Sequence, residues 1–185
     1  GIASDAAAGE DLLIAASTDQ SLWGLAPSGR SVWRVRTSAA LRTSPVVHAG
    51  VVYASLTDRG FCAFDAATGA VRFDLANKAI SFSSPSLAGN AVFYGTSDGW
   101  LHSVDIPTGK FLAHFQSDGS KEHGAKWTDS AGVFQSGRMY PDRTLDGMMI
   151  GMRTMFTVGS ILSSPAIVDG VLYVGSSDGN LYALR

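Results

Sequence analysis

The chain has 185 residues, of which 45% are apolar, 16% are charged and 21 are glycine, and its formal net charge is −2. This length and composition predict one globular, turn-rich domain with a sizeable core. The charge excludes the basic surface that nucleic acid requires, and no apolar run approaches the roughly 18 residues of a membrane-spanning helix. Cys62 is the only cysteine, so an internal disulfide cannot form.

A sequence repeat with a period of about 40 residues organises the chain. A weak first copy, DLLIAASTDQSLWGLA, begins at Asp11, and clearer copies begin at Thr43, Ser83 and Ser163. Ser-Pro pairs at 44–45, 84–85 and 164–165 and a turn aspartate keep the same steps in these three copies. The turn aspartates of the four copies are Asp19, Asp58, Asp98 and Asp178. Aspartates at these positions are typical of hairpin turns. In repeats arranged around a ring, the four turns would lie too far apart to hold one metal ion.

Each copy contains short β-rich segments separated by turns, and the second and third copies have four such segments. Four antiparallel strands per 40 or so residues are typical of a β-propeller blade. The sequence therefore predicts an all-β propeller of four blades in a single domain, 1–185. The predicted repeats span about 4–36, 43–75, 83–115 and 162–185, with a partly helical insert at about 116–160 between blades three and four.

The strand segments VVYAS, AVFYG and VLYVG do not alternate apolar with polar residues. A strand with one face in water should alternate, so these strands are expected to be buried on both faces. A blade between two neighbouring blades meets that expectation. A two-sheet sandwich or an α/β sheet is the alternative, although the repeats lack helical periodicity.

Two copies end in a turn motif, AFDAATGAVRF at 63–73 and SVDIPTGKFLA at 103–113, and GLAPSGRSVW at 24–33 is a shorter version. This pattern resembles the docking motif of propeller repeats of the pyrroloquinoline quinone (PQQ) type. Its aspartates can accept hydrogen bonds from the turn and its glycines supply positive φ. The position that is Trp in the family is Trp33 and Phe73 in the first two copies but Ala113 in the third. We predict structural roles for Trp33, Asp65, Thr68, Gly69, Phe73, Asp105, Thr108 and Gly109.

The resemblance covers most of the chain and implies the fold more strongly than a function. Such repeats occur in quinoprotein dehydrogenases, in an outer-membrane assembly lipoprotein and in sensor ectodomains. In the dehydrogenases PQQ typically lies between an aromatic ring and a disulfide of adjacent cysteines, with calcium beside it. Cys62 alone cannot form that disulfide, so no cofactor is predicted, and PQQ with calcium belongs to the alternative that the chain is part of a dehydrogenase. The resemblance also implies a bacterial periplasmic or extracytoplasmic location.

The insert holds all five methionines. Within TLDGMMIGMRTMF (144–156), helical spacing relates Leu145, Met148, Met149, Met152 and Phe156. One interpretation is a helix that plugs the propeller with its methionine face; the other is an adaptable surface for a partner or ligand. The candidate surface comprises Trp127, Tyr140, Arg143, Met148, Met149, Met152, Arg153 and Phe156. A degenerate fifth blade is a competing interpretation of the whole segment.

Metal sites are weakly indicated. Methionine ligation of copper and a site built from Glu122, His123 and Asp129 are open alternatives. The sequence assigns no role to the other histidines, His48, His102 and His114.

These observations favour a non-enzymatic propeller that acts as a scaffold or as a recognition module for a protein or ligand. A purely structural domain of a larger propeller is a further alternative. A protein partner is expected, nucleic acid is not, and two chains in a homodimer would complete an eight-bladed ring.

Overall fold

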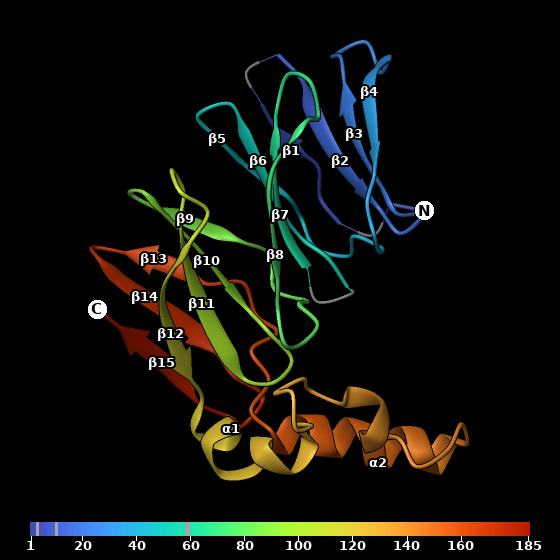
Figure 1. Ribbon diagram of the computed structural model, residues 1–185, viewed down its shortest axis with the longest axis vertical. Coiled ribbons are helices and arrows are strands. Elements are labelled where there is room, and N and C mark those ends of the chain that lie inside the picture. Colours follow the sequence, from blue (N-terminus) through green and yellow to red (C-terminus); the bar gives the residue numbers. More distant parts are fainter. Residues whose placement is uncertain (3, 10, 58–59) are drawn as a thin grey trace.

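The computed structural model describes residues 1–2, 4–9, 11–57 and 60–185. Four antiparallel sheets follow one another along the chain, three of them four-stranded and the last three-stranded. In every sheet the strands are hydrogen-bonded in sequence order, as expected for propeller blades. The sheets form an arc with the first and last sheets at its two ends (Figure 1). The all-β propeller architecture is thereby confirmed.

The strands are short, and each sheet is a simple meander. The first sheet contains β1 (Ala7–Ala8), β2 (Leu13–Ser17), β3 (Ser21–Leu25) and β4 (Ser31–Arg36). The second contains β5 (Val46–His48), β6 (Val51–Ser55), β7 (Gly60–Asp65) and β8 (Val71–Ala76). The third contains β9 (Ser86–Ala88), β10 (Ala91–Gly95), β11 (Trp100–Asp105) and β12 (Phe111–Gln116). The fourth contains β13 (Ala166–Val168), β14 (Val171–Gly175) and β15 (Leu181–Leu184).

The segment between β12 and β13 is a helical insert. It comprises α1 (Asp118–His123), two 3-10 turns at Gly124–Trp127 and Ser136–Met139, and α2 (Leu145–Thr157). Figure 1 shows these helices together at one end of the blades. Among its described residues the only β-pairing is an isolated bridge between Thr128 and Phe134. The segment therefore forms a helical insert, as predicted, and not a degenerate fifth blade.

Apolar residues pack between neighbouring sheets. All five residues of β6 are buried, which fits the absence of alternation in VVYAS. One cluster between the second and third blades includes Tyr53, Phe61 and Tyr94, and the rings of Phe61 and Tyr94 stack with centroids 4.1 Å apart. In the last blade, by contrast, Tyr173 of VLYVG is 38% exposed. Its outer face has no neighbouring sheet to cover it, and so the expectation of double burial holds only inside the arc.

The Ser-Pro pairs join the inner strands of successive blades. The hydroxyl of Ser84 accepts from the amide of Ser44 at 3.0 Å, and the hydroxyl of Ser164 accepts from the amide of Ser84 at 3.2 Å. The hydroxyl of Ser44 in turn accepts from the amide of Asp5 at 3.1 Å. The spacing of 40 and 80 residues thus places equivalent serines in register along the inside of the arc.

The turn motif joins the blades a second time, nearer the rim. The carboxylate of Asp65 accepts from the amide and hydroxyl of Thr68, at 3.0 and 2.9 Å, and Asp105 accepts from the amide of Thr108 at 3.0 Å. The indole of Trp33 in the first blade donates to the carbonyl of Ala66 in the second at 3.0 Å.

Two glycines of the motif leave room for a ring from the preceding blade. Gly69 has a φ of +75°, and a Cβ there would lie 2.8 Å from a ring carbon of Trp33. Gly109 has a φ of +64° and faces Phe73 in the same way. A glycine at this position thus allows the left-handed turn and also leaves room for the ring of the preceding blade.

We expect Gly69→Ala to destabilise the protein more than Gly29→Ala. Both glycines have positive φ, and Gly29 occupies the equivalent turn of the first blade, where no atom lies within 4 Å of the place that a Cβ would take. Gly29→Ala should therefore cost only the left-handed strain of about 1–2 kcal/mol. Gly69→Ala should add about 1–3 kcal/mol from the clash with Trp33. Urea unfolding of both variants measures the difference, and equal losses would show that this inter-blade contact is not tight.

Candidate functional site at the helical insert

The insert is fixed to the turns of the third and fourth blades. The hydroxyl of Ser117 donates to the carbonyl of Gly159 at 2.7 Å, which ties the start of the insert to its end. Ser120 donates to the carbonyl of Asp98 in the β10–β11 turn. Gly119 donates from its amide to the carboxylate of Asp178 in the β14–β15 turn, at 3.0 Å. The insert therefore lies over the second-to-third strand turns of the third and fourth blades.

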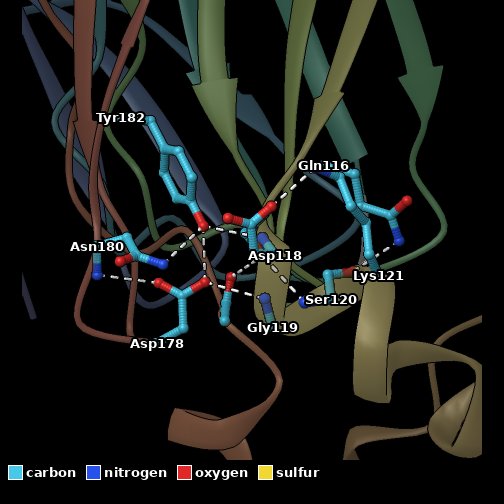
Figure 2. Close-up of polar contacts among 10 residues, drawn as sticks. Gln116, Asp118, Gly119, Ser120, Lys121, Asp178, Asn180 and Tyr182 are labelled. Carbon is cyan, nitrogen blue, oxygen red and sulfur yellow. Dashed lines mark hydrogen bonds and ion pairs between the residues drawn. The ribbon is translucent and has the colours of Figure 1, made fainter.

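Asp178 is the centre of this anchor (Figure 2). Besides the Gly119 amide, its carboxylate accepts from the hydroxyl of Tyr182 at 2.9 Å and from the amide of Asn180 at 3.1 Å. The same Tyr182 hydroxyl accepts from the amide of Asp118 at 2.8 Å, so that blade and helix share one network. Burial would raise the pKa of Asp178, but these hydrogen bonds outweigh it and hold the pKa below the usual 3.8.

The turn aspartates thus serve different purposes. Asp19 forms an ion pair with Arg34 at 3.7 Å, on the surface of the first blade. Asp98 is buried in the third blade, and Asp178 holds the insert. Asp58 lies outside the described residues. Nothing in these surroundings brings the described aspartates together as ligands of one metal ion.

Helix α2 packs through its glycines. The hydroxyl of Thr144 caps the helix by accepting from the amide of Gly147. Gly147 and Gly151 are the buried residues of α2, and a Cβ at either position would collide with Asp142 or with the ring of Tyr140. Because the small residues face inward, most large apolar side chains of the helix are turned to the outside, whereas Met155 packs against the core of the insert.

The outer face of α2 is apolar and exposed. Six large apolar side chains on this one helix are between 47% and 75% exposed. They are Leu145, Met148, Met149, Ile150, Met152 and Phe156. All of them except Ile150 share one side of the helix, and such a group on a protein surface is typical of an interaction site. We refer to Leu145, Met148, Met149, Met152 and Phe156 as the α2 face.

The predicted candidate surface is only partly gathered on this face. Met148, Met149, Met152 and Phe156 lie on it, and Arg143 and Arg153 are exposed beside it. Trp127 and Tyr140 do not belong to it, because they pack beneath α2 against a small core of the insert. That core consists of Ala79, Phe134, Met139 and Val158. Sequence spacing could not reveal this, since it does not show that the Tyr140 ring fills the space that Gly151 leaves or that Trp127 packs against the insert core.

A cavity of about 590 Å³ lies between the third blade and the insert. Its lining includes Trp100 and His102 of β11, His114 and Gln116 of β12, and Lys121 of α1. Lys78 and Asp129 complete its charged wall. Lys78, from the connection between blades two and three, donates to the carbonyl of Ala131 in the insert at 3.0 Å.

Polar side chains connect the buried Thr96 to the wall of this cavity. The hydroxyl of Thr96 donates to Asp98 Oδ1 at 2.5 Å and lies 3.2 Å from His102 Nε2. His102 Nδ1 in turn lies 2.9 Å from His114 Nδ1. Burial, with a smaller contribution from His114, lowers the pKa of His102 to about 3, and burial also raises the pKa of Asp98. His102 is therefore a neutral imidazole at neutral pH.

Sequence reasoning missed the pairing of His102 with His114. The two are direct cross-strand partners, and the register of β11 and β12 shifts by one residue between Ser103 and Val104. Without this bulge His102 would stand opposite Ala113 instead. The sequence does place the two histidines on consecutive predicted strands. Whether they stand opposite each other depends on the bulge, which the sequence pattern does not show.

The structure does not assemble Glu122, His123 and Asp129 into a metal site. His123 lies 3.7 Å from Glu122, and both are exposed. Asp129 instead closes a turn, where its carboxylate accepts from the amides of Ala131 and Val133 and from Gln135. Within the described ranges, no group of three or more histidine, cysteine, aspartate or glutamate side chains could hold a metal ion.

Residues 1–137 match the PQQ-like sequence family described as outer membrane protein assembly factor BamB. The chain belongs to this family. No curated protein matches the sequence.

Solved structures share the BamB-like fold. The crystal structure of BamB from Moraxella catarrhalis matches with a TM-score of 0.71 and 17% identity over 98% of this chain and 49% of that one. The computationally designed protein Ika4 matches with a TM-score of 0.69 and 14% identity, over 100% of this chain and 91% of that one. Quinohemoprotein alcohol dehydrogenase from Comamonas testosteroni matches with a TM-score of 0.67 and 14% identity, over 95% and 29%. This chain thus spans about half the length of BamB.

We expect Asp178→Ala to loosen the insert while leaving the blades folded. Hydrogen bonds to a charged group contribute about 1.5–3 kcal/mol each, so amide exchange at 118–123 should accelerate by about tenfold or more. Hydrogen exchange followed by mass spectrometry measures this. Asp19→Ala, in the equivalent turn of the first blade, is the control and should leave the insert unchanged.

The same experiment has a defined pH dependence. The lowered pKa of Asp178 means that its carboxylate stabilises the folded anchor fully above 3.8, the unfolded value, and progressively less as the pH falls below it. The difference between wild type and Asp178→Ala should therefore shrink in acid. A difference that stays constant through this range would argue against the ionised carboxylate as the anchor.

Proposed function

We propose that this chain is a non-enzymatic propeller scaffold that holds a protein partner on the α2 face. The exposed apolar side chains on a firmly anchored helix are the observation that carries the proposal. The family, described as an outer membrane protein assembly factor, supports a role in the assembly of outer membrane proteins and an extracytoplasmic location. Within the described part of the chain, no helix is both long and apolar enough to span a membrane.

The chemistry of the face indicates the kind of partner. Methionine side chains are flexible and polarizable, and so they fit apolar surfaces of varied shape. Arg143 and Arg153 are exposed beside the face, and among the described residues neither takes part in an ion pair with the insert's acidic side chains. A partner segment with an apolar stripe flanked by acidic residues would complement both features.

Photo-crosslinking in the organism that encodes the chain tests this proposal. A photoreactive phenylalanine analogue at Met149 should crosslink to one defined partner, identified by mass spectrometry as a component of outer membrane protein assembly. The same analogue at Val71, an exposed apolar residue of β8 in the second blade, is the matched control. If the analogue crosslinks to the same proteins at both positions, the proposal is contradicted.

Substitution of the face gives the quantitative test. Replacing Met148, Met149, Met152 and Phe156 by serine should weaken binding of the identified partner by about tenfold or more for each side chain that the complex buries. The replaced side chains are exposed, so the fold should survive, as circular dichroism can verify. Unchanged binding would favour the alternative of a purely structural domain.

The quinoprotein alternative has its own test. The likeness to quinohemoprotein alcohol dehydrogenases lies under 20% identity and concerns the fold. Titration with PQQ and calcium, followed by tryptophan fluorescence, is expected to show no saturable change. Saturable quenching in the micromolar range would overturn the non-enzymatic proposal.

We further propose that two chains associate to complete a ring of eight blades. Apolar side chains are exposed at both ends of the arc, among them Val32 and Leu13 on the first blade and Tyr173 and Leu181 on the last. A shared ring would cover the two outer faces and protect the sheet edges. Light scattering on a sizing column should give twice the mass of one chain, and a monomer at micromolar concentration would contradict this arrangement.

A further inference from the structure

A cross-strand pair in the outer half of each complete blade occupies the same structural position but differs in chemistry. In the first blade Trp23 pairs with Arg34, whose guanidinium carbon lies 4.5 Å from the indole centroid. In the second blade Cys62 pairs with Asp74, and the thiol donates to the carboxylate at 3.3 Å. In the third blade the pair is His102 and His114. The fold therefore does not require histidines at this position.

The third-blade pair alone opens onto the cavity between blade and insert. We propose that His102 and His114 bind a divalent transition-metal ion with tetragonal preference, above all Cu²⁺, through their Nδ1 atoms. Metal–imidazole bonds are about 2.0–2.1 Å long, so two cis ligands at a right angle lie about 2.9 Å apart. The two Nδ1 atoms are 2.9 Å apart.

The surroundings of His102 set the required tautomer. Because the Thr96 hydroxyl donates to Asp98, its oxygen can accept from His102 Nε2–H. That leaves the Nδ1 lone pair of His102 directed at His114. Histidines that bind metal ions commonly donate their second nitrogen to such an outer network.

His114 provides the second nitrogen with little rearrangement. If His102 carries its proton on Nε2, the Nδ1–H of His114 donates to His102 Nδ1 in the metal-free pair. On metal binding this proton moves through solvent to His114 Nε2, and the ion lies to one side of the line between the two Nδ1 atoms, so no net proton is lost. His114 is exposed, and its ring can turn to aim the lone pair at the ion. Water from the cavity fills the remaining positions, since Asp129 is engaged in its own turn.

Copper titration of the untagged full chain tests the proposal. Trp100 borders the pair, with its ring centroid 6.2 Å from that of His114, so bound Cu²⁺ should quench its fluorescence with a stoichiometry of one ion per chain. Electron paramagnetic resonance should show nitrogen coupling from two imidazoles. His114→Gln should abolish the second nitrogen signal and weaken binding by at least about tenfold.

Four variants separate this site from other copper ligands. His48→Gln and His123→Gln alter exposed histidines elsewhere and should bind as wild type does. Thr96→Val removes the outer hydroxyl and should weaken binding by about tenfold, with thermal melting as the check on folding. Replacement of Met148, Met149 and Met152 by serine should have no effect. The proposal is overturned if wild type shows no saturable copper binding, if His114→Gln binds like wild type, or if the methionine or His123 variants lose the ion.

Discussion

Burial of each sheet between two neighbours is the constraint on which the rest of this structure depends. A blade such as β5–β8 has apolar residues on both faces of β6 and β7, and it cannot satisfy both faces alone. Stacking solves this for the inner blades and leaves Tyr173 and Leu181 of the last blade uncovered. Both the buried interfaces between the inner sheets and the apolar ends of the arc follow from that requirement.

The contacts that align the blades explain why the repeat is so regular. Hydrogen bonds of 3.0–3.2 Å between the serines of the Ser-Pro pairs align the inner strands of successive blades. Aromatic rings that pack against the glycine turns align the outer strands. Between these two lines of contact, the fold does not fix the identity of one cross-strand pair. Trp23–Arg34, Cys62–Asp74 and His102–His114 occupy the position in three blades. Such positions let a repeat protein acquire chemistry in one blade without disturbing the stack.

How much the sequence predicts depends on whether a feature is local. The period of 40 residues and the Asp-Thr-Gly turns identify the blades, because strands and turns have local signatures. The spacing of Leu145 to Phe156 identifies a helix for the same reason. Which side of α2 faces outward depends on Tyr140 and Asp142 packing onto Gly147 and Gly151, and no local pattern contains that contact. The His102–His114 pair depends on a bulge, which changes register by a single residue.

The bond between Ser117 and Gly159, at 2.7 Å, has a consequence for how the insert arose and how it can be replaced. The chain leaves the third blade and returns to the fourth at nearly the same point, so the blades keep their spacing whatever lies between those two residues. Loops with adjoining ends accept insertions at low cost. This junction is therefore a natural grafting site, where an exchange of about forty residues would give the same scaffold a different recognition surface.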